Sequence, residues 1–97
     1  MQQSAEDNEK HFLGLLRKHR PDLILMDMNM PEIDGLEVTR RIKASELLAA
    51  IPIIMVTGNN TKTDIMNCLK AGASDYIVKP INRDILLDKI SKLFTKS

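Results

Sequence analysis

The sequence has little cysteine, no excess of either charge and no long hydrophobic run. Its one cysteine, Cys68, excludes a disulfide within the chain, and a lone thiol is typical of the reducing cytoplasm. Fourteen basic side chains balance 13 acidic ones, which excludes the strongly basic surface of proteins that bind nucleic acids or anionic membranes. No apolar run approaches the ~20 residues of a membrane-spanning helix, and the polar residues 1–7 do not resemble a signal peptide. We therefore expect a cytoplasmic protein that binds neither nucleic acid nor membrane.

Length and composition limit the fold to one domain. At 97 residues and 11.0 kDa, the chain can build one hydrophobic core, so residues 1–97 are treated as a single domain. Apolar residues make up 43% and charged residues 28%, which is ordinary for a globular chain and excludes a disordered tail or a fibrous repeat.

Three short apolar runs predict buried strands at residues 22–27, 51–57 and 75–80. None of them alternates between apolar and polar residues, and continuous apolar runs are typical of parallel strands that are covered on both faces. The segments between them, 28–50 and 58–74, are long enough for crossover helices and too long for hairpins. The sequence therefore predicts a parallel sheet.

Helical spacing of apolar residues predicts four helices, at about 7–19, 36–43, 62–71 and 82–94. Asp34-Gly35 starts the second, Ala71-Gly72 ends the third, and Asn82 caps the last. In the first helix we expect four residues to point inward: Phe12, Leu13, Leu15 and Leu16. The order of one helix followed by three strand–helix units gives an α/β fold.

Each predicted strand ends in a polar residue, namely Asp27, Thr57 and Lys79. Because the carboxyl ends of parallel strands line the crevice where ligands bind, these side chains should converge on one site. The carboxylate could accept a phosphoryl group, which the hydroxyl and ammonium groups would then hold. The alternative is structural, with Thr57 capping the next helix and Lys79 preceding a proline turn.

Three segments carry a family resemblance. Residues 21–31 with Asp34-Gly35 resemble the phosphoacceptor strand and loop of response-regulator receiver domains, which act in two-component signalling. Residues 55–57 resemble the switch-threonine strand of that family, and residues 68–80 its last strand. Residues 68–72 and 79–81 most resemble receivers fused to hybrid histidine kinases. The resemblance implies a flavodoxin-like three-layer fold, here with about three strands and four helices.

The resemblance also implies roles for five residues. Asp27 would be the phosphoacceptor, Asn29 would offer its backbone carbonyl to Mg²⁺, and Lys79 would contact the phosphate. Thr57 would be the switch hydroxyl and Tyr76 the switch aromatic. The implied partner is a histidine kinase or phosphotransfer protein. Any enzymatic activity would be limited to self-phosphorylation and dephosphorylation at Asp27, since nothing in the sequence supports turnover of a small molecule.

One departure from the family pattern concerns the N-terminal part. Receivers open with a strand that ends in an acidic pair, then a helix and a second strand, whereas nothing before Asp27 matches this pattern. Since those acids hold Mg²⁺, we expect weak binding of Mg²⁺ by Asp27 and the Asn29 carbonyl alone. This departure leaves an alternative function, a phosphorylation-independent interaction module.

The same departure predicts self-association. Without a neighbouring strand, Leu23 to Met26 would form an unpaired apolar edge, and such edges template pairing with another chain. Most homo-oligomers close with two-fold symmetry. We therefore expect a homodimer that buries Leu23, Leu25 and part of the helix at 7–19.

Overall fold

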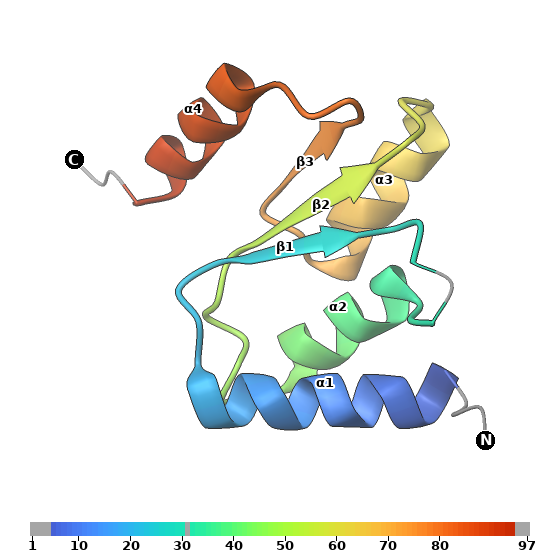
Figure 1. Ribbon diagram of the computed structural model, residues 1–97, viewed down its shortest axis with the longest axis vertical. Coiled ribbons are helices and arrows are strands. Elements are labelled where there is room, and N and C mark those ends of the chain that lie inside the picture. The colour runs from blue at the N-terminus through green and yellow to red at the C-terminus, as the bar shows by residue number, and fades with distance from the viewer. Residues whose placement is uncertain (1–4, 31, 95–97) are drawn as a thin grey trace.

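Helices and parallel strands alternate along the chain in the structure, a computed structural model that describes residues 5–30 and 32–94 (Figure 1). In chain order the elements are α1 (Ala5–His19), β1 (Ile24–Asp27), α2 (Gly35–Ala44), β2 (Ile53–Thr57), α3 (Lys62–Ala71), β3 (Asp75–Val78) and α4 (Arg83–Phe94). The strands form one sheet in the order β1-β2-β3, and both pairs are parallel. This architecture confirms the predicted α/β class with a flavodoxin-like layout.

The strand register brings the carboxyl ends of all three strands to one edge of the sheet. Asp27 lies beside Val56 of β2, and Thr57 lies beside Val78 of β3, one residue before Lys79. The register therefore places the three predicted strand-end residues along the same edge.

Capping residues fix the ends of the helices close to the predicted positions. Asp34 accepts backbone hydrogen bonds in the first turn of α2, and Asn82 does so at the start of α4. Gly72 ends α3 in the left-handed region, with φ of 110°. Thr61 caps the start of α3, so the alternative role considered for Thr57 was wrong.

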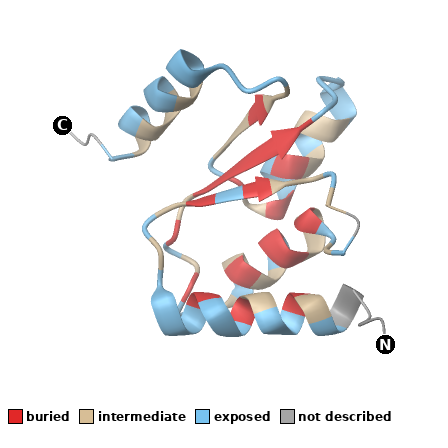
Figure 2. Cartoon of the chain, in the orientation of Figure 1, coloured by how far each residue is buried: buried red, intermediate tan, exposed pale blue. Residues whose placement is uncertain are grey.

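The core lies mainly between the sheet and the three helices α1, α2 and α3 (Figure 2). The residues buried there are Leu13, Leu16, Ile24, Met26, Val38, Ile42, Leu48, Ile51, Ile53, Met55, Cys68 and Ala73. A smaller cluster on the opposite face contains Ile54, Val56 and Ile77, against which Leu86, Ile90 and Leu93 of α4 pack. No residue of α4 is itself buried.

Two expectations about burial were wrong. Strand β1 is not covered on both faces, as the 47% exposure of Leu25 shows. Its face of the sheet carries only α4 among the described helices, and α4 packs on β2 and β3 instead. Leu15 does not point inward, since the residue is 42% exposed, whereas Leu13 and Leu16 are buried.

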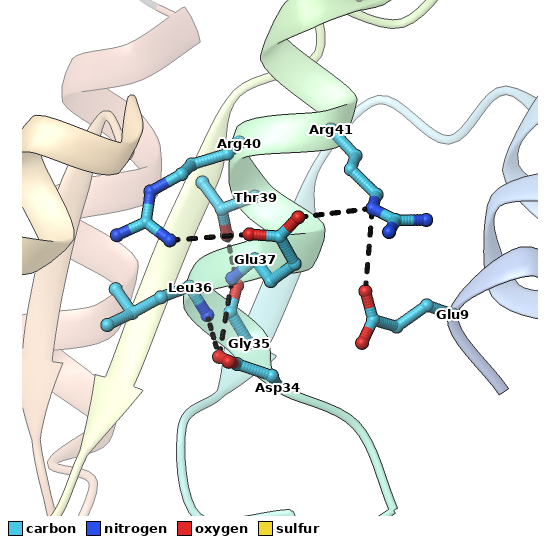
Figure 3. Close-up of polar contacts among 8 residues, drawn as sticks. All are labelled: Glu9, Asp34, Gly35, Leu36, Glu37, Thr39, Arg40 and Arg41. Carbon is cyan, nitrogen blue, oxygen red and sulfur yellow. Dashed lines mark hydrogen bonds and ion pairs between the residues drawn. The ribbon is translucent and has the colours of Figure 1, made fainter. Parts of the chain in front are cut away.

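An ionic cluster joins α1 to α2 (Figure 3). The Glu9 side chain is 7% exposed, and its Oε1 lies 3.7 Å from Arg41 Nε. The same nitrogen lies 3.3 Å from Glu37 Oε1. Arg41 thus lies between two acids from different helices, and Glu9 Oε1 accepts no hydrogen bond from any residue that the structure describes. Among the described residues, no helix is both long and apolar enough to cross a membrane.

Candidate functional site

Asp27 and Lys79 meet at the carboxyl edge of the sheet. Lys79 Nζ donates to both carboxylate oxygens of Asp27, at 3.0 Å to Oδ1 and 2.9 Å to Oδ2. The two side chains come from β1 and from the residue after β3, which are separated by β2. Both are partly open to solvent, with 41% of the Asp27 side chain and 35% of the Lys79 side chain exposed. The pair is therefore accessible to a ligand.

The surroundings of Asp27 keep its carboxyl group ionised. The backbone N–H of Asn29 donates to Asp27 Oδ1 at 2.8 Å, and this hydrogen bond is the largest cause that lowers the pKa of Asp27. The hydrogen bonds and the charge of Lys79 lower the pKa further, whereas desolvation raises it. An ionised carboxylate at an open edge can attack an electrophilic phosphorus atom.

Two glycines lie close to the segment that contains Asp27 and Asn29. A Cβ atom at Gly35 would lie 3.2 Å from Met26 Cγ and 3.4 Å from the Asp27 carbonyl oxygen. A Cβ atom at Gly58 would lie 3.1 Å from Asn29 Nδ2. Both glycines therefore allow α2 and the end of β2 to approach the segment that carries Asp27 and Asn29 closely.

The third strand-end residue, Thr57, bonds elsewhere. Its side chain is buried, and Oγ1 donates to the Asn59 carbonyl at 3.1 Å and accepts from the Asn59 N–H at 3.1 Å. This is a local turn in which a threonine hydroxyl satisfies its own loop. The structure thus brings Asp27 and Lys79 together and directs Thr57 toward Asn59, although all three lie on the same edge.

Tyr76 lies on β3 beside Met55, half-buried, on the face that α1, α2 and α3 cover. Ile77 faces the other way and belongs to the cluster under α4. Lys89 Nζ of α4 lies 5.2 Å from the centroid of the Tyr76 ring and 3.0 Å from Asp75 Oδ1. Sequence reasoning missed this contact, because no spacing rule relates a helix residue to a strand it packs beside.

The donor set suits a magnesium ion only in part. Asp27 offers a carboxylate and Asn29 a backbone carbonyl, which are the oxygen donors that Mg²⁺ prefers. Within residues 5–30 and 32–94, no three His, Cys, Asp or Glu side chains gather in a way that could hold a metal. Lys79 moreover bonds both Asp27 oxygens, so a cation must compete with its ammonium group.

Comparison with known proteins places the chain in a family. The model of the response regulator receiver domain matches residues 2–91. The chain belongs to this family. It is therefore a receiver domain of two-component signalling, as the resemblance of its motifs implied.

Two relatives are similar in sequence to most of this chain. The chain is 46% identical over 83 residues to the transcriptional regulatory protein AfsQ1 of Streptomyces coelicolor, covering 86% of this chain and 34% of that protein. It is 49% identical over 75 residues to the polar-differentiation response regulator DivK of Brucella anthropi, covering 77% of this chain and 61% of that protein. The chain thus spans between about a third and three fifths of these relatives.

A solved structure supports the same assignment. The receiver domain of the sensor histidine kinase PA1611 from Pseudomonas aeruginosa matches with a TM-score of 0.75 and 37% identity, over 87% of this chain and 69% of that one. That structure has a magnesium ion coordinated in its active site cleft. Receiver domains generally bind Mg²⁺ in their active site and interact with histidine kinases or phosphotransfer proteins.

Proposed function

We propose that this receiver accepts a phosphoryl group on Asp27 from a phosphohistidine of a histidine kinase or phosphotransfer protein. An Asp27 oxygen would attack phosphorus while the bond from phosphorus to the imidazole nitrogen breaks and its electron pair returns to the imidazole. The hydrogen bonds from Lys79 to both Asp27 oxygens are the observation that carries this proposal, because they place a cation where the charge of the phosphoryl group would lie.

The signal would then be conformational. A phosphoryl group carries about two negative charges near neutral pH. Thr57 would leave Asn59 to bond it, and Tyr76 would turn inward along the face that both residues share. The surface formed by α3, β3 and α4 would present this change to a partner.

The proposed metal ligands are Asp27 and the Asn29 carbonyl, with water filling the other positions. A bound Mg²⁺ would supply positive charge for the transferring phosphoryl group. Weak binding follows from the single carboxylate and from the competing ammonium group of Lys79.

Intact mass measured after incubation with Mg²⁺ and acetyl phosphate tests the proposal. We expect slow, partial addition of one phosphoryl group, because Mg²⁺ is held weakly. Asp27→Asn should abolish the addition. Asp22→Asn is the matched control, since Asp22 is an exposed acid just before β1, and it should label as the unsubstituted chain does. Labelling that survives Asp27→Asn would contradict the proposal.

A second candidate function is a phosphorylation-independent interaction module. Two observations favour it: Thr57 is engaged by Asn59, and the described residues hold no three-member acidic cluster for a metal. The test measures the affinity of a partner for the unsubstituted chain, with and without phosphodonor, and for Asp27→Asn. Three equal affinities would favour this module over the phosphoacceptor.

We also propose a homodimer that pairs two β1 edges, with Leu23, Leu25 and part of α1 buried. The supporting features are the terminal place of β1 in the sheet and the half-exposed Leu25 side chain. A net charge of +1 opposes association only weakly. Light scattering over a dilution series should show dimers for the unsubstituted chain and monomers for Leu25→Lys. A monomer at every concentration would exclude this dimer.

A further inference from the structure

Lys89 of α4 contacts two successive residues of β3 whose side chains face opposite sides of the sheet. Its ammonium nitrogen donates to Asp75 Oδ1 at 3.0 Å and lies 5.2 Å from the centroid of the Tyr76 ring. Since β3 is an edge strand, one ammonium group can reach around its free edge to both faces. The Lys89 side chain is 24% exposed, so these contacts lie partly out of water.

Asp75 fixes the position of this ammonium group relative to the tyrosine. Asp75 Oδ1, which accepts from Lys89, also accepts the backbone N–H of Tyr76 at 2.8 Å. One carboxylate oxygen therefore ties the helix lysine to the backbone of the residue whose ring that lysine contacts. Asp75, Tyr76 and Lys89 form a closed cluster, which we call the β3-edge cluster.

Among the described residues, the other contacts between α4 and the sheet are apolar and only partly buried. No residue of α4 is buried, and its apolar contacts are the partly buried Leu86, Ile90 and Leu93. Its other ion pair, between Lys92 and Asp88, lies within the helix and is exposed. Lys89, by contrast, makes a polar side-chain contact that joins α4 to the sheet.

We propose that Lys89 is a positioning residue for Tyr76. A cation over the face of an aromatic ring attracts it, so Lys89 favours the present place of the ring at the β3 edge. It thereby disfavours the turn of the ring toward Thr57, which lies on the same face of the neighbouring strand. This role rests on the proposed function of Tyr76 as a switch, and it adds the group that sets the resting balance of that switch.

Coupling between α4 and Tyr76 follows from this arrangement. A partner that draws Lys89 away from the β3 edge would release the Tyr76 ring. Because coupling between two sites is reciprocal, an inward turn of the ring would in return weaken the contact between α4 and β3. The contact should shift the ratio of the two ring positions about two- to fivefold, the effect of a weak, partly exposed cation–π interaction.

The test uses the whole chain without phosphodonor or Mg²⁺, so its outcome does not depend on phosphorylation of Asp27. Tyr76 is the one tyrosine and the sequence has no tryptophan, so its tyrosine ring resonances and its fluorescence come from a single residue. Lys89→Met keeps the apolar stem and removes the charge. We expect side-chain coupling constants of Tyr76 to report a two- to fivefold change in the rotamer ratio. Lys89→Arg should restore the original ratio.

Lys92→Met is the matched control, because it removes an exposed lysine from the same helix without touching the β3-edge cluster. It should leave the ratio unchanged. A Tyr76 ratio that is insensitive to Lys89→Met, or that Lys89→Arg fails to restore, would overturn the proposal. If Lys89→Met does not fold, a measurement on the unsubstituted chain tests the proposal instead. Nuclear Overhauser effects between the Lys89 ε-protons and the Tyr76 ring are expected, and their absence would equally overturn it.

Discussion

The two faces of the sheet are built very differently, and two adjacent residues of β2 make the comparison. Ile53 and Ile54 are the same residue type, both 0% exposed, and they point to opposite faces. Ile53 packs in the large cluster with residues of α1, α2 and α3. Ile54 packs with Val56 and Ile77 under α4, which buries none of its own residues.

The difference between the two faces assigns most of the stability to one face and the more easily moved helix to the other. The face under α1, α2 and α3 holds most of the buried apolar residues and so supplies most of the hydrophobic stabilisation. On the face under α4, Leu25 is left about half-exposed, and α4 buries none of its own residues. Elements with few buried contacts open locally at low cost. The helix that contacts Tyr76 is therefore the one that can move most easily.

The largest expected effect compares the two isoleucines directly. Ile53→Ala should lower the free energy of unfolding by about 3–5 kcal/mol, and Ile54→Ala by about 2–3 kcal/mol. The loss at Ile54 is smaller because α4 can settle into the cavity, whereas the three helices over Ile53 hold one another in place. Urea unfolding of both variants measures the difference. Equal losses would mean that the two faces are equally rigid.

A backbone position on the well-covered face comes next. Gly72→Ala should cost about 1–3 kcal/mol, because φ is 110° there and a Cβ atom would lie 2.6 Å from Lys43 Cγ. Lys43 cannot easily yield, since its ammonium group donates to the carbonyls of Ala49 and Ile51, at 3.0 and 2.8 Å. Thermal unfolding checks the cost. The control Gly14→Ala has open space and should stabilise α1 by about 0.5–1 kcal/mol.

The ionic cluster between α1 and α2 should have a moderate effect. Arg41→Met leaves the buried Glu9 carboxylate without its ion-pair partner, which should cost about 1–2 kcal/mol. Arg40→Met is the matched control, because Arg40 pairs with Glu37 on the exposed surface, and it should change stability by less than about 0.5 kcal/mol. Chemical unfolding of the two variants distinguishes them. If the two variants lose similar free energies of unfolding, the ion pair between Glu9 and Arg41 does not stabilise the packing of α1 on α2.

The smallest effect on stability is expected at the site itself. Lys79→Ala should change the free energy of unfolding by less than about 0.5 kcal/mol, because Lys79 and Asp27 are both partly exposed. The pKa of Asp27 should rise toward its ordinary value but stay below it. The hydrogen bond from the Asn29 N–H, which is the largest cause of the lowered pKa, remains in this variant. Carboxyl carbon shifts in a pH titration measure this change.

The sign of the linked pH effect follows from the lowered pKa of Asp27. A carboxyl group whose pKa is lower in the folded state stabilises the fold above its unfolded pKa, and this contribution is lost as the pH falls through the folded pKa. Lys79→Ala should therefore make the fold less sensitive to acid in that range. A loss of stability as large as that of Ile54→Ala would make Lys79 a structural residue and would contradict its proposed role.

Much of the fold could be predicted because local signals agreed with one another. Apolar runs gave the three strands, and the caps Asp34, Gly72 and Asn82 gave helix ends within a few residues of those in the structure. The prediction failed at Leu15 and Leu25, because none of the described elements covers these two residues. Apolar patterning states that a side chain prefers burial, but the neighbouring elements decide whether burial occurs.

The sequence by itself determined the order of the elements, the parallel sheet and the row of polar residues at the strand ends, because these depend on spacing along the chain. The tertiary structure decided which of those residues meet: Lys79 bonds Asp27, whereas Thr57 bonds Asn59. It also brought Glu9 to Arg41 and Lys89 to Tyr76. Contacts of this kind depend on how helices dock on the sheet, and docking is set by the packing of surfaces that lie far apart in the chain.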